Sequence, residues 1–187
     1  MKEMGIIMTG NHPKLILDGI KTMTRRVIKP QPFKCEHCGD LAIVDKKGFY
    51  RHLSNMKDGG CPYGQVGDRL WVRETWRPYS EKDVRIEYKA DGSIVDYPEQ
   101  PQFSFYACGQ NWHPSLFMPR WASRILLEIT DIRVEHLNQI SDSDVMKEGV
   151  DDLVTFMLLW DRLNKKRGYG WEMNPWVFVI SFRRLKQ

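Results

Sequence analysis

The stretch SRILLEITDIRV, residues 123–134, carries the longest strand signal in the chain. Aliphatic and β-branched residues dominate it, which is typical of a strand packed against a core. A second apolar run, WVFVISF at residues 176–182, predicts a mostly buried strand, and DRLWVRETW at residues 68–76 alternates with the period of a strand. Weaker signals predict strands at residues 5–8, 84–89 and 103–107, with a loop at 91–101.

Helix signals are fewer and shorter. Residues 11–18 have an N-cap residue, a proline in the first turn and a closing glycine. Ser141 caps a second short helix that Gly149 ends, and Asp151 or Asp152 caps a longer third one. This third helix has an apolar stripe, which we interpret as core packing: Leu153, Phe156, Met157, Trp160 and Leu163. The pattern predicts an α+β fold, a small mixed β-barrel flanked by short helices at its rim.

Composition indicates a globular chain. Of its 187 residues, 42% are hydrophobic and 12% aromatic, and 28 Lys and Arg against 24 Asp and Glu give a net charge of +4. This mild excess permits an anionic partner without requiring one. No apolar run approaches the roughly 20 residues of a membrane helix, and the N-terminus is unlike a signal peptide. We expect one domain over residues 1–187 in the cytoplasm, with no membrane partner; the sequence leaves the oligomeric state open.

Residues 19–26, GIKTMTRR, concentrate groups suited to catalysis. Lys21 can accept a proton if burial or nearby cations lower its pKa. Thr24 can then act as a nucleophile or orient a water, while Arg25 and Arg26 suit phosphate or a polarised carbonyl. The alternative is a solvated basic turn. Because a regular strand would put Lys21 and Thr24 on opposite faces, the catalytic interpretation requires a turn or bulge after Gly19.

The region from residue 33 to 64 is interpreted as an inserted loop resembling a zinc knuckle. Cys35 and Cys38 form a Cys-x-x-Cys-Gly turn, and Cys61 begins a second, incomplete turn of this kind. The candidates for a fourth ligand are His52, His37, Cys108 and His113. We select His52 because it lies in the same loop, which predicts a structural zinc held by Cys35, Cys38, His52 and Cys61. The alternative is a set of free thiols.

Glu74 is a second carboxylate of interest. In the predicted strand it shares a face with Leu70 and Val72, so it points inward and needs a cationic partner. It either pairs with an arginine as part of the structure or binds the amino edge of a base. Trp76 and Trp71 are candidates for stacking on that base.

Three motifs together resemble the ASCH-domain family: G-x-K-T-x-T-x-R at residues 19–26, CPYGQVGDRLWVRETW at 61–76 and NPWV at 174–177. The longer form is similar to ASCH proteins of bacteriophage and prophage regions. The resemblance implies a PUA-like fold, in which a small β-barrel and short helices border a pocket. Family members include N4-acetylcytidine amidohydrolases, RNA-binding proteins and ribonucleases.

The resemblance also implies site residues. The catalytic lysine and threonine of the amidohydrolases map onto Lys21 and Thr24, and their glutamate, which follows the central strand on a short helix, maps onto Glu148. The implied reaction is hydrolysis of N4-acetylcytidine to cytidine without a catalytic metal. Arg25, Arg26, Glu74 and Trp76 are then substrate-binding candidates. An RNA-binding module without turnover, or a ribonuclease, remains the alternative, so the expected partner is a modified nucleoside or RNA.

Overall fold

The computed structural model describes residues 1–45, 47–55, 60–79, 85–97 and 111–186. The strand predicted at 103–107 and the candidate ligand Cys108 lie outside these ranges.

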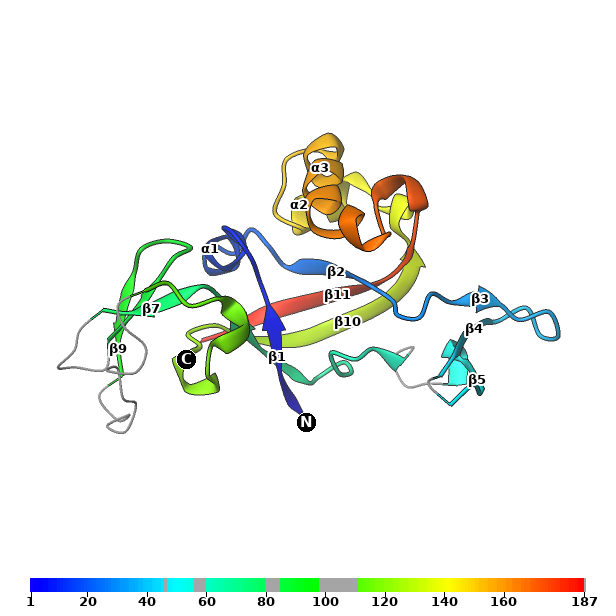
Figure 1. Ribbon diagram of the computed structural model, residues 1–187, viewed down its shortest axis with the longest axis horizontal. Coiled ribbons are helices and arrows are strands. Elements are labelled where there is room, and N and C mark those ends of the chain that lie inside the picture. The colour runs from blue at the N-terminus through cyan, green and yellow to red at the C-terminus, as the bar shows by residue number, and fades with distance from the viewer. Residues whose placement is uncertain (46, 56–59, 80–84, 98–110, 187) are drawn as a thin grey trace.

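The centre of the molecule is a five-stranded sheet in the order β1-β6-β10-β11-β2 (Figure 1). Its strands are β1 (Glu3–Ile7), β2 (Met23–Val27), β6 (Arg69–Arg73), β10 (Leu126–His136) and β11 (Trp176–Leu185). The two stretches with the strongest apolar patterns become β10 and β11, which pair antiparallel along almost their whole length. The β1–β6 pair is parallel, while β6–β10 and β11–β2 are antiparallel.

These elements confirm the α+β class that the sequence predicted. The strand order has two ends, β1 and β2, and the pairing among the described residues does not close the sheet into a barrel.

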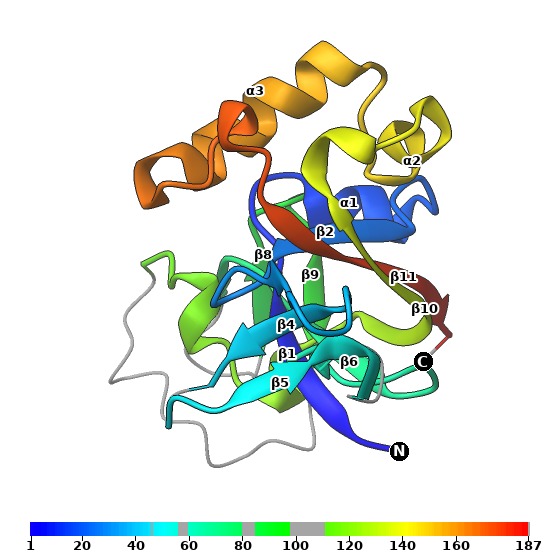
Figure 2. The ribbon, with the colours of Figure 1, turned by 90° about the vertical axis from the view of Figure 1, so that its right-hand side faces the viewer.

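Helices and aromatic side chains cover both faces of this sheet. Alternate residues of β11 belong to different core clusters, because successive side chains of a strand point to opposite faces. Phe178 and Ile180 pack with Ile16 of α1 (His12–Leu17), while Val177 and Val179 pack with residues of α2 (Asp142–Lys147) and α3 (Leu153–Asn164). Figures 1 and 2 show α2 and α3 together above the sheet. The segment that precedes β2 therefore lies close to the helices.

Two small sheets flank the central one. The order β3-β4-β5 comprises β3 (Phe33–Lys34), β4 (Leu41–Val44) and β5 (Tyr50–His52). The order β7-β8-β9 comprises β7 (Trp76–Pro78), β8 (Arg85–Tyr88) and β9 (Ile94–Asp96). They lie at opposite ends of the molecule in Figure 1, and β4 and β5 face the viewer in Figure 2. The prediction of a loop at 91–101 was wrong at β9, a short strand that forms because β8 offers it a partner.

The strand predicted at 68–76 is divided in the structure. Its first part is β6, which ends at Arg73, and Trp76 begins β7 in a different sheet. Glu74 lies between the two and therefore does not extend the face of Leu70 and Val72 as an element of β6.

Short 3₁₀ helices complete the described fold: Leu53–Asn55, Ser115–Phe117, Arg120–Ala122, Leu137–Gln139, Lys165–Arg167 and Trp171–Met173. Among the described residues, none of the helices has the length and apolar character needed to cross a bilayer.

Candidate functional site

Lys21 lies in the turn between α1 and β2 that the catalytic interpretation required. The N–H groups of Ile20 and Lys21 both donate to the carbonyl of Leu15, at 2.9 and 3.0 Å, and so bend the chain away from the end of α1. Thr22 N–H then donates to Lys147 O at 2.9 Å, and Thr22 O accepts from Phe182 N–H at 2.9 Å. These bonds tie the segment that carries Lys21 to both α2 and β11.

Glu148 reaches the same place from the C-terminal end of α2. The helix starts as predicted, because the hydroxyl of Ser141 accepts from Asp144 N–H at 3.2 Å. The helix ends at Lys147 and the chain turns away at Gly149, whose φ of +85° is in the left-handed region. A Cβ at this position would lie 3.2 Å from the Cβ of Lys21, so glycine also permits the close approach of the two segments.

The amine of Lys21 and the carboxylate of Glu148 form a buried ion pair. Lys21 Nζ donates to Glu148 Oε2 at 2.7 Å and to the backbone carbonyl of Glu148 at 2.6 Å. Only 1% of the Lys21 side chain and 7% of the Glu148 side chain are exposed. Burial lowers the pKa of Lys21; the Glu148 carboxylate opposes this effect, and the charges of Arg26 and Arg25 add to it.

Arg25 holds the second oxygen of the Glu148 carboxylate within a larger ionic network. Its Nη1 lies 3.4 Å from Glu148 Oε1, and its Nη2 lies 2.7 Å from Glu135 Oε1 and 2.8 Å from Asp144 Oδ2. Arg133 also contacts Asp144 Oδ2, at 2.7 Å. Three carboxylates therefore bind the Arg25 guanidinium, and one of these contacts holds the Glu148 side chain in place.

A cavity of about 650 Å³ adjoins this ion pair. His12, Thr24 and Glu148 contribute to its wall, together with Arg25 and Arg26. Lys21 does not line it and is linked to it through the Glu148 carboxylate. The volume falls within the range of small-molecule sites, and a few polar groups among apolar ones are characteristic of such sites.

The apolar residues of α3 contribute both to the core and to the wall of the cavity, whereas the sequence predicted only core packing. Phe156 and Trp160 are buried in the core cluster beneath α3, as predicted, and both also line the cavity. The prediction was wrong for Leu153 and Leu163 at the two ends of the stripe, which are 38% and 40% exposed, and Leu163 lines the cavity. The helix therefore gives the cavity an apolar, partly aromatic wall.

His12 was missed by the sequence analysis, which treated the start of α1 only as a helix signal. Its imidazole lines the cavity next to the basic segment. Burial, followed by the charges of Lys21 and Arg26, lowers the pKa of His12 to about 3. A neutral imidazole therefore faces the cavity at physiological pH, and only a contact across the fold could have revealed it.

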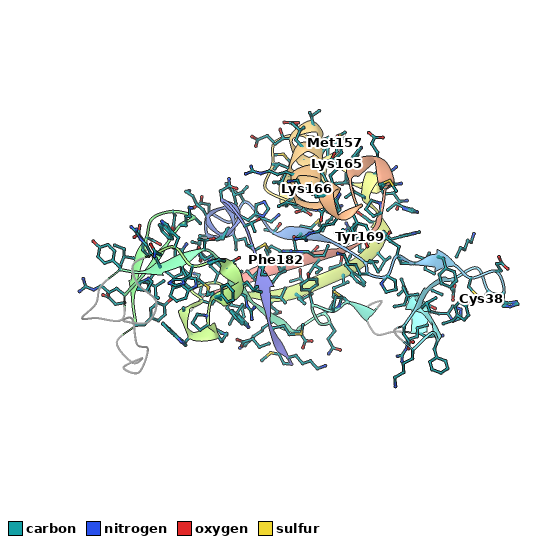
Figure 3. All side chains as sticks on the ribbon, in the orientation of Figure 1. Cys38, Met157, Lys165, Lys166, Tyr169 and Phe182 are labelled. Atoms are coloured by element: carbon teal, nitrogen blue, oxygen red, sulfur yellow. The ribbon has the colours of Figure 1, made fainter. Side chains whose placement is uncertain are left out.

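Basic groups follow the cavity toward the end of α3. Lys29 and Arg167 line it, and Lys29 Nζ lies 4.8 Å from the centre of the Tyr169 ring. Figure 3 shows Lys165 and Lys166 on the short helix above Tyr169. Arg26 is anchored nearby by donating from Nη2 to Ile7 O at 2.7 Å.

Glu74 occupies a separate buried site. Arg124 binds its carboxylate through Nε and Nη2, both at 2.8 Å, and contacts Asp91 at 2.8 Å. Burial raises the pKa of Glu74, and the charge of Arg124 opposes this. Glu74 does not line the cavity. The structure therefore matches the first of the two interpretations offered for this residue, pairing with an arginine.

Trp76 likewise does not line the cavity. It is buried in a cluster with Ile86 and Tyr88, and its ring stacks on His113 with 4.9 Å between centroids. The structure therefore does not bring Glu74 and Trp76 together with Lys21, Thr24 and Glu148. Their predicted role in substrate binding stays a prediction.

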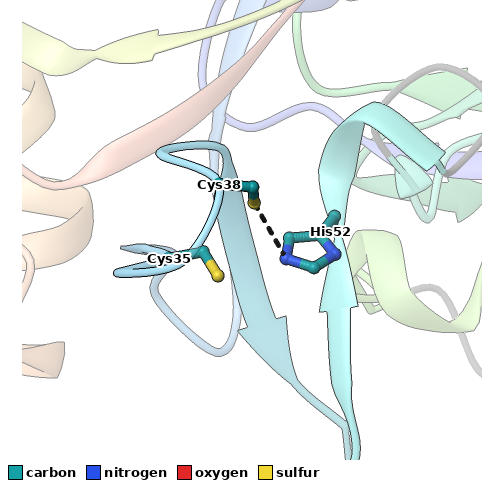
Figure 4. A group of neighbouring side chains, drawn as sticks. All are labelled: Cys35, Cys38 and His52. Atoms are coloured by element: carbon teal, nitrogen blue, oxygen red, sulfur yellow. Dashed lines mark hydrogen bonds between the residues drawn. The ribbon is translucent and has the colours of Figure 1, made fainter.

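Three of the four predicted metal ligands lie together. Ligand atoms of Cys35, Cys38 and His52 are within 4.8 Å of one another, and Cys38 Sγ lies 3.4 Å from His52 Nε2 (Figure 4). A hydrogen bond from His52 and others from the backbone lower the pKa of the Cys35 thiol to about 6. This group can bind a metal ion. Cys61 is not part of it: this residue is buried in the main core cluster with Ile6.

Comparisons with known proteins give structural matches only. No protein-family model and no curated protein matches the sequence. The chain is similar to the solved structure of an ASCH domain from Lactobacillus crispatus, at 13% identity and a TM-score of 0.45, over 98% of this chain and 79% of that chain. It is also similar to a protein from Enterococcus faecalis, at 9% identity and a TM-score of 0.46, over 99% and 80% of the two chains.

A solved ASCH domain is thus among the structures to which this chain is similar, as the sequence motifs predicted. At such identities side-chain chemistry does not transfer between proteins, so the chemistry of the cavity depends on the residues of this chain.

Proposed function

We propose that the cavity is the active site of an amidohydrolase that removes an acetyl group from the exocyclic nitrogen of a modified nucleoside, with N4-acetylcytidine as its substrate. The observation that carries the proposal is the buried contact of 2.7 Å between Lys21 and Glu148, whose carboxylate faces a cavity shared with Thr24. Buried titratable groups beside a cavity are characteristic of catalytic sites. The motif at residues 19–26 supports the choice of substrate.

Lys21, Glu148 and Thr24 have complementary roles in this proposal. A water, oriented by Thr24 Oγ1, attacks the acetyl carbonyl, and the Lys21–Glu148 pair accepts its proton. The tetrahedral intermediate then breaks its C–N bond, and the same pair returns the proton to the leaving nitrogen. Water and amide are thereby converted to acetate and cytidine. Burial lowers the pKa of Lys21, which makes it easier for this buried ammonium group to release a proton.

The cavity wall is suited to a nucleobase. Phe156 and Trp160 line the cavity on the side of α3, where they supply apolar contact; both are core residues with 3% and 5% of their surface exposed. His12, held neutral, can donate or accept a hydrogen bond with the polar edge of the base. Arg25, in contrast, is assigned a positioning role, because its guanidinium is bound by Glu148, Glu135 and Asp144.

The test is to incubate the purified chain with N4-acetylcytidine and to follow cytidine by chromatography. We expect release of cytidine by the wild type and loss of turnover in Lys21→Ala. Because Lys21→Ala also opens a void at a buried position, Lys21→Met and Thr24→Val serve as variants that preserve volume, and circular dichroism checks their folding. Folded variants that keep full turnover would contradict the assignment of these residues.

RNA binding without turnover is the second candidate, and the basic residues along the cavity favour it. Lys29, Arg26 and Arg167 suit contacts to phosphate. Failure to release cytidine, together with retention of RNA that weakens steeply with salt, would support this candidate over the hydrolase. Cleavage of unmodified RNA that is lost in Lys21→Ala would instead indicate a ribonuclease, whereas cleavage that survives the substitution would indicate a contaminating nuclease.

We propose that the metal bound by Cys35, Cys38 and His52 is zinc, for which two thiolates and an imidazole are typical ligands. With Cys61 buried in the core, the described residues bring three protein ligands together, and the candidate Cys108 lies outside the described residues. Residues 33–64 are then an insertion of a domain that spans residues 1–187. No step of the proposed hydrolysis requires this metal.

A further inference from the structure

The small sheet β3-β4-β5 has little core of its own. Its strands contain two, four and three residues, and most of their side chains are exposed or half-buried. Ala42 in this sheet and Leu53 directly after it are its buried apolar residues. Short strands with so little apolar burial are marginally stable by themselves, and small units of this kind commonly use a structural metal.

The Cys35, Cys38 and His52 side chains bring together the turn between β3 and β4 and the end of β5. Cys35 N–H donates to Asp40 O and Gly39 N–H to Cys35 O, both at 2.8 Å, which closes the turn between β3 and β4 and presents both thiols. His52 ends β5, where it pairs with Ala42 of β4. Tetrahedral zinc has bonds of about 2.3 Å to sulfur and about 2.0 Å to nitrogen. The observed separations of the ligand atoms, all within 4.8 Å, therefore need only a small closure.

The same sheet also forms part of the cavity wall. Leu53, which follows His52 directly, lines the cavity, and so does Ile43 of β4. Ile43 pairs with Arg51, one residue before His52. Cys38 lies at the outer end of the sheet in Figure 3, away from Tyr169 and the end of α3. The metal group is thus on the periphery, but its histidine is covalently adjacent to a residue of the cavity.

We propose that zinc bound by Cys35, Cys38 and His52 fixes the cavity wall formed by Ile43 and Leu53, so that occupancy of the metal site controls how tightly the cavity holds its ligand. Zinc ties the turn before β4 to the end of β5 and thereby sets the position of Leu53. This inference depends on zinc binding at the three residues. It holds for any ligand of the cavity and does not depend on the amidohydrolase reaction.

The metal site is tested by titrating the metal-free protein with Co²⁺, which reports tetrahedral thiolate ligation through its visible d–d bands and its thiolate charge-transfer band. We expect both bands in the wild type, with displacement by one equivalent of Zn²⁺. Cys38→Ser and His52→Ala should lower the affinity about 100-fold or more. His37→Ala is the matched control, because His37 is exposed in the same turn and outside the group, and it should bind as the wild type does.

The link to the cavity is tested by methyl NMR of Ile43 and Leu53 with and without Zn²⁺. We expect both methyl signals to shift in the wild type and in His37→Ala, and to stay unchanged in His52→Ala. Leu127 and Ile180, buried in the main core, report that each variant is folded. Absence of the cobalt bands, or metal binding that leaves Ile43 and Leu53 unchanged, would overturn the proposal. Neither readout involves turnover, so failure of the hydrolase proposal is recognised separately.

Discussion

Two glutamates are buried among the described residues, Glu148 and Glu74, each against a basic side chain, and of these two Glu148 lines the cavity. Glu148 contacts Lys21 at 2.7 Å and lines the cavity beside Thr24. The carboxylate of Glu74 is bound by Nε and Nη2 of Arg124, both at 2.8 Å, and Glu74 does not line that cavity. Burial and ion pairing are therefore shared features, and access to a ligand is the feature that separates the two sites.

The basic partner differs in a way that matters for chemistry. Arg124 keeps its proton under all physiological conditions, so its pair with Glu74 is a fixed structural contact. Lys21 carries an amine whose pKa burial lowers, and this amine can exchange a proton. The proposed reaction therefore uses the lysine pair, whereas we expect the arginine pair to contribute to stability.

The largest expected effect is on turnover. Glu148→Gln removes the proton-accepting carboxylate and keeps its shape, so we expect the rate of cytidine release to fall about 10³-fold. Glu74→Gln, the matched substitution at the other buried pair, should keep turnover within a few-fold of the wild type. The rates are compared by single-turnover chromatography. Equal losses in the two variants would remove the functional distinction between the sites.

The next effect is on stability, at the other pair. Glu74→Ala removes the carboxylate that binds the buried Arg124 guanidinium at two points, while the contact with Asp91 stays, and it should lower the free energy of unfolding by about 3 kcal/mol. Urea unfolding measures the change. In the double variant Glu74→Ala/Arg124→Met the buried charge that lost this partner is gone, so part of the loss should return. A single variant as stable as the wild type would show that this pair contributes nothing to the fold.

A pH-dependent effect should distinguish Lys21 from an ordinary surface lysine. Since its pKa in the folded protein is lowered from 10.5, the unfolded chain binds more protons between the two pKa values. The free energy of unfolding of the wild type should therefore rise relative to that of Lys21→Met as pH increases toward 10.5, by at most about 1.4 kcal/mol per pH unit. Urea unfolding from pH 7 to 10 provides the comparison. If the difference in the free energy of unfolding between the two proteins stays constant with pH, the effect of Glu148 on the pKa of Lys21 outweighs the effect of burial.

The smallest effect concerns the titration of a single ring. With its pKa lowered to about 3, the imidazole of His12 should show no protonation shift in NMR spectra between pH 7 and 5. Protonation of His12 near pH 6.5 would show that the cavity wall is more hydrated than the packing around it implies.

The sequence predicted the elements whose signals are local. The apolar stretches at 123–134 and 176–182 became β10 and β11, and Ser141 and Asp152 cap their helices through hydrogen bonds to Asp144 N–H and Thr155 N–H. The short strand β9 was not predicted, because its three residues form a strand only through pairing with β8.

The candidate site was partly predictable because its motif is local. The motif at residues 19–26 identified Lys21 and Thr24, and the resemblance to ASCH domains identified Glu148. The spacing of the cysteines wrongly predicted Cys61 as a metal ligand; it packs in the main core as a small apolar residue. His12 has no sequence signature, since its neighbours Lys21 and Arg26 reach it only after the chain folds back.

The most direct measurement is a crystal structure of Glu148→Gln, the variant expected to bind without turnover, grown with N4-acetylcytidine. We expect the acetylated base in the cavity, with its amide between residue 148 and Thr24 and its ring against the part of the cavity wall that α3 forms. A nucleoside bound instead against Glu74 and Trp76, or the cavity left empty at saturating nucleoside, would contradict it.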